Sequence, residues 1–177
     1  QNEFLTAENK KLRELLDESI NSQEIFARVL IDKDSPYLKS VVLNKGTKDK
    51  VKIGMAVIDG AYLVGQIIEV NYTNSRALLL SDLNSKIPSV LAPNDVQTVL
   101  SGTGKNYGII EHTQYVSKKD INEKERVVYT SGLGGLFKPG IPIGKMNISS
   151  NGIVNFFSDF TQLSYVKIVS YKSGGEE

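Results

Sequence analysis

The chain has 177 residues, a formal net charge of +1, 40% hydrophobic residues and no cysteine. This length suits one large or two small domains, and the composition is that of a chain that can bury a core. The near-zero charge gives no electrostatic footprint for nucleic acid, and the lack of Cys excludes disulfides, thiol nucleophiles and Cys-ligated metals.

The first expected element is a helix over residues 1–24 with a coiled-coil seam. Its apolar positions alternate at spacings of four and three residues, as the a and d positions of a heptad do. The seam residues are Leu5, Asn9, Leu12 and Leu16. A lone Asn at an a position favours a parallel two-stranded coil, so the seam predicts a homodimer. The alternative is a single amphipathic helix that lies on its own domain.

The seam begins at once after Gln1, with no capping signal before it, which suggests further sequence upstream. No apolar run approaches the roughly 18 to 20 residues of a membrane helix, and no signal sequence opens the chain.

From Ile25 onward the hydrophobic period is that of β-strands, separated by turn residues such as Asp59-Gly60 and Ser150-Asn-Gly. We expect strands at Phe26–Ile31, Lys39–Asn44, Met55–Ile58, Tyr62–Asn71, Arg76–Leu80, Lys86–Leu91, Thr98–Ser101, Gly108–His112, Arg126–Thr130, Ile143–Ile148, Val154–Phe157 and Leu163–Tyr171.

About a dozen short strands are many for one small barrel but suit two six-stranded barrels, which leave no exposed strand edges. The fold class is therefore mainly β, with an N-terminal coiled-coil helix followed by two small barrels. The polar stretch Ser81–Ser85 places the first barrel at residues 25–84 and the second at 85–172. The last strand can also return to the first barrel. Residues 173–177 are expected to form a disordered tail.

His112, Asp120 and Ser131 occur in the order of a serine-protease triad. In two-barrel proteases the triad assembles across both barrels, whereas all three residues here lie in the second half. Ser131 also lacks a preceding Asp. We therefore expect no catalytic residues and no enzymatic activity.

Other candidate sites are weak. Gly102–Lys105 resembles a phosphate loop but lacks the upstream Gly and the metal-binding Ser or Thr, so it is interpreted as a turn. With one His in the chain and no carboxylates at calcium-loop spacing near Asp32 and Asp34, no metal or cofactor is predicted. Glu123 and Glu125 belong to a charged, solvated stretch.

The most distinctive motif is TSGLGGLFKPGIPIG, Thr130–Gly144. Its glycines suit tight bends and close strand approaches, and Phe137 is expected to fill the space beneath them. We interpret the motif as architectural. Its expected structural residues are Ser131, Gly132, Gly134, Gly135, Phe137, Pro139, Gly140, Pro142 and Gly144.

At this motif the sequence resembles the MreC family of rod shape-determining proteins. The segment is similar to that family's TSGLGG-x-FP-x-GIP-x-G signature, with Lys138 in place of the first Pro. The stretches DGAYLVGQIIEV (59–70) and SRALLLSDLNSKIPSVL (75–91) and the leading EN-x-x-LR-x-LL also resemble MreC sequences. The resemblance extends from about Leu5 to Ile148.

This resemblance implies a scaffold on the periplasmic side of the bacterial inner membrane, anchored by an upstream helix. It implies a homodimer that, with MreD and an MreB-containing complex, organises lateral peptidoglycan synthesis and binds a class B penicillin-binding transpeptidase. It also implies protease-like barrels without an active site, and it supplies no catalytic residues and no cofactor. One alternative is a periplasmic adaptor of an efflux or secretion machine, although adaptors carry outgoing and returning helices and this chain has one. Another is a degenerate hydrolase.

Overall fold

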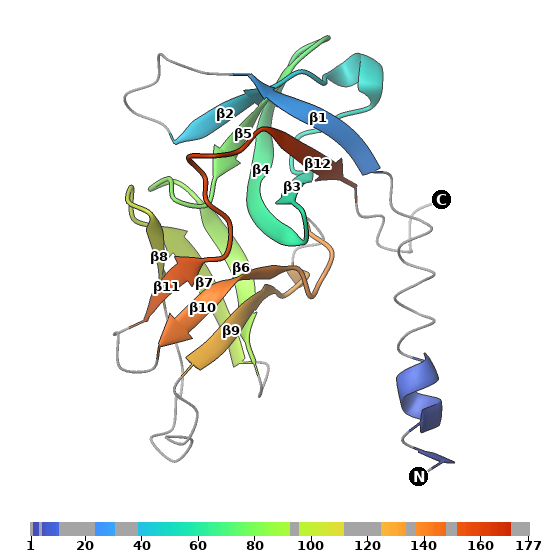
Figure 1. Ribbon diagram of the computed structural model, residues 1–177, viewed down its shortest axis with the longest axis vertical. Coiled ribbons are helices and arrows are strands. Elements are labelled where there is room, and N and C mark those ends of the chain that lie inside the picture. Colours follow the sequence, from blue (N-terminus) through green and yellow to red (C-terminus); the bar gives the residue numbers. More distant parts are fainter. Residues whose placement is uncertain are drawn as a thin grey trace.

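The computed structural model describes residues 2–3, 5–10, 24–30, 39–92, 96–111, 125–133, 137–147 and 152–170. Within these residues the chain forms two closed β-barrels of six strands each. Figure 1 shows the first barrel above the second, with the N-terminal helix to one side. The expectation of a mainly β fold with two six-stranded barrels is confirmed.

The first barrel has the strand order β1-β12-β3-β4-β5-β2, and all its pairs are antiparallel. Inward-facing side chains along these strands form its core, with Leu43, Val64 and Ile67 fully buried. A short 3-10 helix, η1 (Thr47–Asp49), follows the second strand. The strands are β1 (Glu24–Leu30), β2 (Ser40–Leu43), β3 (Ala56–Asp59), β4 (Tyr62–Val70), β5 (Ser75–Leu79) and β12 (Tyr165–Val169).

The last strand, β12, closes this first barrel. It pairs with β1 on one side and with β3 on the other, so the expected boundary that placed it in a second barrel of residues 85–172 is wrong. The alternative that the last strand returns is what the structure shows. The physical reason is closure, because without β12 the edges of β1 and β3 would be unpaired. The chain therefore leaves the first barrel after β5 and re-enters it at its end (Figure 1).

The second barrel contains the strands from the middle of the chain, in the order β10-β11-β8-β7-β6-β9. Its core includes Ile87, Leu91, Leu100 and Ile143, each no more than 1% exposed. The strands are β6 (Lys86–Leu91), β7 (Val96–Gly102), β8 (Tyr107–Glu111), β9 (Glu125–Thr130), β10 (Pro142–Asn147) and β11 (Ile153–Phe156). Each predicted strand is present, with ends that differ by up to two residues.

One hydrophobic cluster continues from the first barrel into the second. Leu63 of β4 and Val169 of β12 belong to the same cluster as the core of the second barrel. Phe160, in the connection between β11 and β12, packs against this cluster and against the core of the first barrel. The barrels thus share apolar contacts, and this apolar surface is removed from water where they meet.

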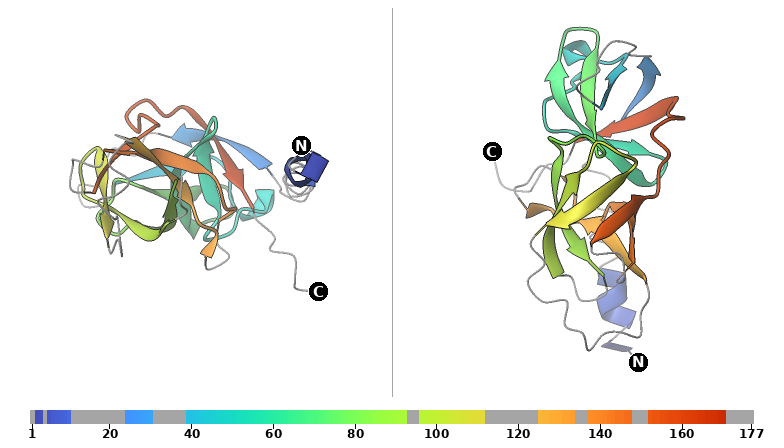
Figure 2. Two further views of the ribbon diagram at one scale, coloured as in Figure 1. Left: turned by 90° about the horizontal axis from the view of Figure 1, so that it is seen from below. Right: turned by 90° about the vertical axis from the view of Figure 1, so that its left-hand side faces the viewer.

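The expected coiled-coil helix over residues 1–24 is not supported. Within this range the structure describes a short helix, residues 2–3 and 5–10. Leu12 and Leu16 lie outside the described residues. Leu5 is 55% exposed and Asn9 is exposed. A seam this narrow can be buried only against a second helix, and short isolated helices are marginal in water. The described helix lies to one side of the barrels in the left-hand view of Figure 2.

Candidate functional site

The glycine-rich motif begins at Thr130, the last residue of β9, whose side chain is 1% exposed. Its hydroxyl donates to the main-chain oxygen of Lys138 at 2.6 Å and accepts from the main-chain N–H of Ile141 at 3.0 Å. The main-chain N–H of Gly140 also donates to the oxygen of Thr130. One buried hydroxyl therefore holds together both ends of the loop between β9 and β10.

Two of the glycines take conformations that other residues adopt with strain. Gly132 and Gly140 have φ values of 74° and 85°, in the left-handed region. Gly144 serves a different purpose, because a Cβ there would overlap the main-chain oxygen of Asn155 on the neighbouring strand β11. Gly134 and Gly135, where we also expected tight bends, lie outside the described residues.

Phe137 lies in the core shared by the barrels and is 2% exposed. Of the two prolines, Pro139 is exposed and Pro142 opens β10.

Ser131 is bonded locally. Its Oγ accepts from the N–H of Leu133 at 3.2 Å, and its own N–H donates to the oxygen of Pro88 at 3.1 Å. These bonds are those of a turn residue that ties the loop to β6. His112 and Asp120, the other members of the considered triad, lie outside the described residues.

The remaining candidates from the sequence have local roles. Thr103–Asn106 connects β7 to β8, with Gly104 at φ 78° and the Thr103 hydroxyl bonded to the oxygen of Tyr107. The segment is a hairpin turn. Glu125 lies 3.6 Å from the Lys145 ammonium across the pair of β9 and β10.

Glu123, Asp32 and Asp34 fall outside the described residues. Among the residues that the structure describes, no group of His, Asp or Glu could hold a metal ion, and no helix is long and apolar enough to cross a membrane.

Sequence reasoning missed Asp82, a carboxylate only 2% exposed at the junction of the barrels. It accepts from the N–H of Lys39, which precedes β2, and from the N–H of Asn84, both at 2.7 Å. A Cβ at position 102 would overlap the main-chain oxygen of Asp82, so Gly102 lets the β7–β8 hairpin approach Asp82 closely. The polar stretch Ser81–Ser85 indicated a boundary between the barrels, but gave no sign of the contact with Lys39, which spans 43 residues.

These observations define a class: mainly β proteins with two barrels joined by a shared apolar cluster, the first of which is closed by a returning final strand. The family described as "Rod shape-determining protein MreC, barrel core" matches residues 29–170. The chain belongs to the MreC family.

The relatives agree with this assignment. The chain is similar to the cell shape-determining protein MreC of Haemophilus influenzae, with 36% identity over 161 residues that cover 87% of this chain and 44% of the relative. Among solved structures, MreC of Listeria monocytogenes aligns with a TM-score of 0.78 and 25% identity over 98% of this chain and 89% of that one.

A third similar structure is a complex of penicillin-binding protein PBP2 with MreC from Helicobacter pylori. It aligns with a TM-score of 0.53 and 14% identity over 86% of this chain and 91% of that chain, which shows a shared fold. The chain spans about half the length of the curated relatives that it matches, 44% and 47% for two of them.

Proposed function

We propose that this chain is the barrel-bearing part of a non-catalytic scaffold that maintains cell shape by organising lateral peptidoglycan synthesis. The observation that carries the proposal is the family match over residues 29–170, which covers both barrels. The local bonds of Ser131 support a non-catalytic role, because its hydroxyl is engaged in a turn. A shared core supports a scaffold role, because a scaffold must present its surfaces in fixed positions.

The proposed partner is a class B penicillin-binding transpeptidase. The similar chain from Helicobacter pylori is seen in a complex with PBP2, and this supports the proposal for a chain of the same fold. MreD and an MreB-containing complex complete the proposed assembly. The proposed location is the periplasmic side of the bacterial inner membrane, with an anchoring helix upstream.

A capture experiment tests this function. The chain is immobilised and exposed to detergent-solubilised membranes of a rod-shaped bacterium, and the bound proteins are identified by mass spectrometry. Recovery of a class B transpeptidase or MreD is expected, and binding is then repeated with the purified transpeptidase. Recovery of an exporter in their place would contradict the scaffold and favour an adaptor. Labelling of Ser131 by a serine-directed probe, lost in Ser131→Ala, would contradict the non-catalytic role.

We further propose that the N-terminal helix forms a parallel homodimer through Leu5, Asn9, Leu12 and Leu16. Support comes from the heptad spacing and from the 55% exposure of Leu5, which leaves this side chain available to a partner. A two-heptad coil is short, so the dimer of this chain should be weak and concentration-dependent. An anchor that holds two chains in one membrane would raise their effective concentration, to about millimolar for short tethers.

Asn9→Leu tests the dimer. It should tighten self-association and loosen the preference for two strands, because the polar residue that fixes strand number is removed. Sedimentation equilibrium over a wide concentration range measures both effects. A wild-type chain that stays monomeric at the highest concentration, with Asn9→Leu unchanged, would mean that the seam does not pair.

A further inference from the structure

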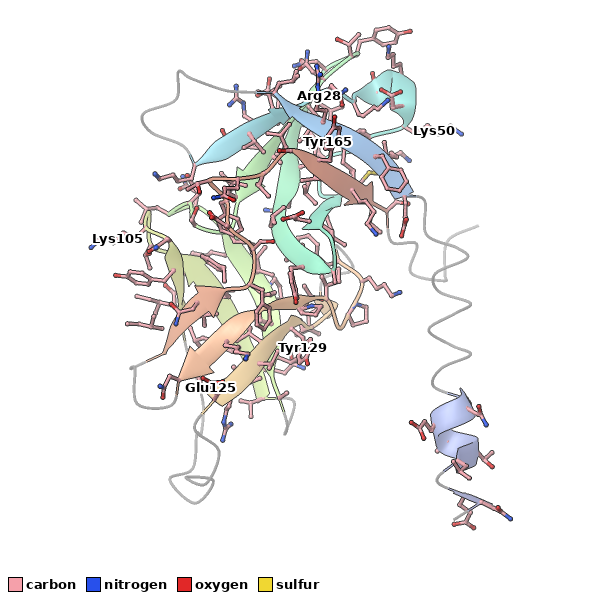
Figure 3. The ribbon with its side chains drawn as sticks, in the orientation of Figure 1. Arg28, Lys50, Lys105, Glu125, Tyr129 and Tyr165 are labelled. Atoms are coloured by element: carbon pink, nitrogen blue, oxygen red, sulfur yellow. The ribbon has the colours of Figure 1, made fainter. Side chains whose placement is uncertain are left out.

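A groove of about 570 Å³ lies where the two barrels meet. Its walls are Lys39 before β2, the β7–β8 turn, and the end of β11 with the connection to β12. Leu79 and Ser81, at and after the end of β5, line it as well. The side of the molecule that carries these segments faces the viewer in the right-hand view of Figure 2. Figure 3 shows Lys105, in the β7–β8 turn, projecting outward at this side. The volume is in the range of clefts that bind ligands.

The first two walls are fixed by hydrogen bonds. The main chain of Lys39 is held by the buried carboxylate of Asp82 and by a bond from the N–H of Leu79 to its oxygen. The β7–β8 turn is tied to the segment between the barrels, since the N–H of Gly104 donates to the oxygen of Ser81 at 2.7 Å. The groove therefore exists before any ligand arrives, which lowers the entropy cost of binding.

The third wall is fixed as well. The hydroxyl of Ser158 donates to the Asp59 carboxylate at 3.2 Å, which ties this connection to the end of β3. The rings of Phe156 and Phe160 are in contact, with centroids 5.0 Å apart, and give the groove an apolar surface. The groove thus combines an apolar surface with polar groups from both barrels, as ligand sites do.

The polar groups that remain available in the groove are mostly donors. Within the described part of the chain, the ammonium groups of Lys39 and Lys105 have no ion-pair partner, and both residues are exposed. The side-chain amides of Asn106 and Asn155 have no hydrogen-bond partner there either. The Ser81 hydroxyl, on a residue only 5% exposed, likewise has none and lines the groove.

The one carboxylate in the groove, that of Asp159, has one of its two oxygens engaged within its own turn. Asp159 accepts from the hydroxyl of Thr161 at 2.6 Å and from its N–H at 3.0 Å. These bonds lower the pKa of Asp159, so it stays ionised at neutral pH without a cation beside it. The two free ammonium groups outnumber this single carboxylate, so the groove keeps a net positive charge, and its amides and hydroxyl can donate to a ligand. Such a surface complements a ligand that is anionic and rich in acceptors.

We propose that this groove binds an acidic peptide segment of a partner protein. The carboxylates would pair with the ammonium groups of Lys39 and Lys105, one contributed by each barrel. Main-chain carbonyls of the peptide would accept from Asn106, Asn155 and Ser81, and the methylenes of its Glu side chains would cover the Phe156–Phe160 pair. A peptide fits better than a small anion because the groove also has the apolar Phe156–Phe160 surface, which the methylenes of Glu side chains can cover and a small ion cannot.

The test uses the whole chain, a short polyglutamate peptide as the probe and a polyglutamine peptide of equal length as its neutral counterpart. Isothermal titration at low salt should show binding of polyglutamate alone, weakened as salt is raised. The double variant Lys39→Gln/Lys105→Gln should weaken binding about tenfold, since each exposed ion pair contributes about a two- to fivefold factor. Chemical shifts of the Asn106 and Asn155 side-chain amides should move on titration.

The matched control is Lys48→Gln/Lys52→Gln. It removes the same charge from two exposed lysines on and just after η1, which do not line the groove. An equal loss of affinity in this control would show attraction to net charge alone and overturn the site. Inorganic phosphate that displaces the peptide at equal concentration would overturn the peptide in favour of a small-anion site. Binding to the isolated chain needs no transpeptidase, so failure here leaves the proposed scaffold function untouched.

Discussion

The substitution Thr130→Val removes one hydroxyl and keeps the shape of the side chain. In the folded chain this hydroxyl bonds the oxygen of Lys138 and the N–H of Ile141, and Ile141 is itself 7% exposed. Each bond contributes about 1 kcal/mol, and a buried group left without a partner costs about 1–3 kcal/mol. We therefore expect Thr130→Val to lower the free energy of unfolding by about 2–4 kcal/mol, and Tm by about 5–15 °C.

Thr130→Ser is the matched control, because it keeps the hydroxyl and removes one methyl group. Its expected cost is about 1 kcal/mol, the contribution of one buried methyl. Urea denaturation followed by far-UV circular dichroism measures both variants, and unchanged m-values would show that the denatured states are comparable. If Thr130→Val lost no more stability than Thr130→Ser, the hydroxyl would not hold the loop between β9 and β10.

Two further predictions concern backbone approach and acid stability. Gly144→Ala should destabilise the chain by about 1–3 kcal/mol, because the new Cβ overlaps the neighbouring strand. Gly140→Ala should cost about 1 kcal/mol, because its Cβ meets open space and only the positive φ is strained. Thermal denaturation that ranked the two variants in reverse would contradict the close approach of β10 and β11 at Gly144. The pKa of Asp159 lies below its ordinary value of 3.8, so its contribution to stability is present above that value and is lost as pH falls through the folded pKa. Thr161→Val, which removes the hydroxyl bond and keeps the N–H bond, should raise this pKa toward 3.8, as followed by NMR titration of the carboxyl carbon. An unchanged titration would show that the Thr161 hydroxyl is not a cause of the lowered pKa.

The strands were predictable because local signals agree along most of the chain. In β6, Lys86–Leu91, the buried pattern alternates and turn residues lie on both sides, so the predicted bounds match the structure. The start of β1 was placed two residues late, at Phe26, because Glu24 is exposed and its side chain gives no hydrophobic signal. Phe26 itself is 70% exposed, so its apolar character was not a sign of burial.

The sites that the sequence did not reveal depend on partners distant in the chain. Asp82 bonds the main chain of Lys39, a contact that depends on main-chain groups and leaves no sequence signal. The Thr130 hydroxyl likewise bonds a main-chain oxygen and a main-chain N–H of the loop, and such groups are present whatever the residue type. The coiled-coil seam is a different case, since a clear local pattern would need a second chain for its burial, and the homodimer stays a prediction.

The returning strand β12 makes the composition-based boundary near residue 84 a poor guide to stability. Because β12 completes the first barrel and the shared core includes side chains of both, we expect the barrels to unfold as one cooperative unit. Ile67→Ala, in the core of the first barrel, should cost about 2–5 kcal/mol. Amide hydrogen exchange should then show an equal loss of protection in β4 and in β9, although β9 belongs to the second barrel. Unchanged protection in β9 beside a loosened β4 would mean that each barrel unfolds by itself.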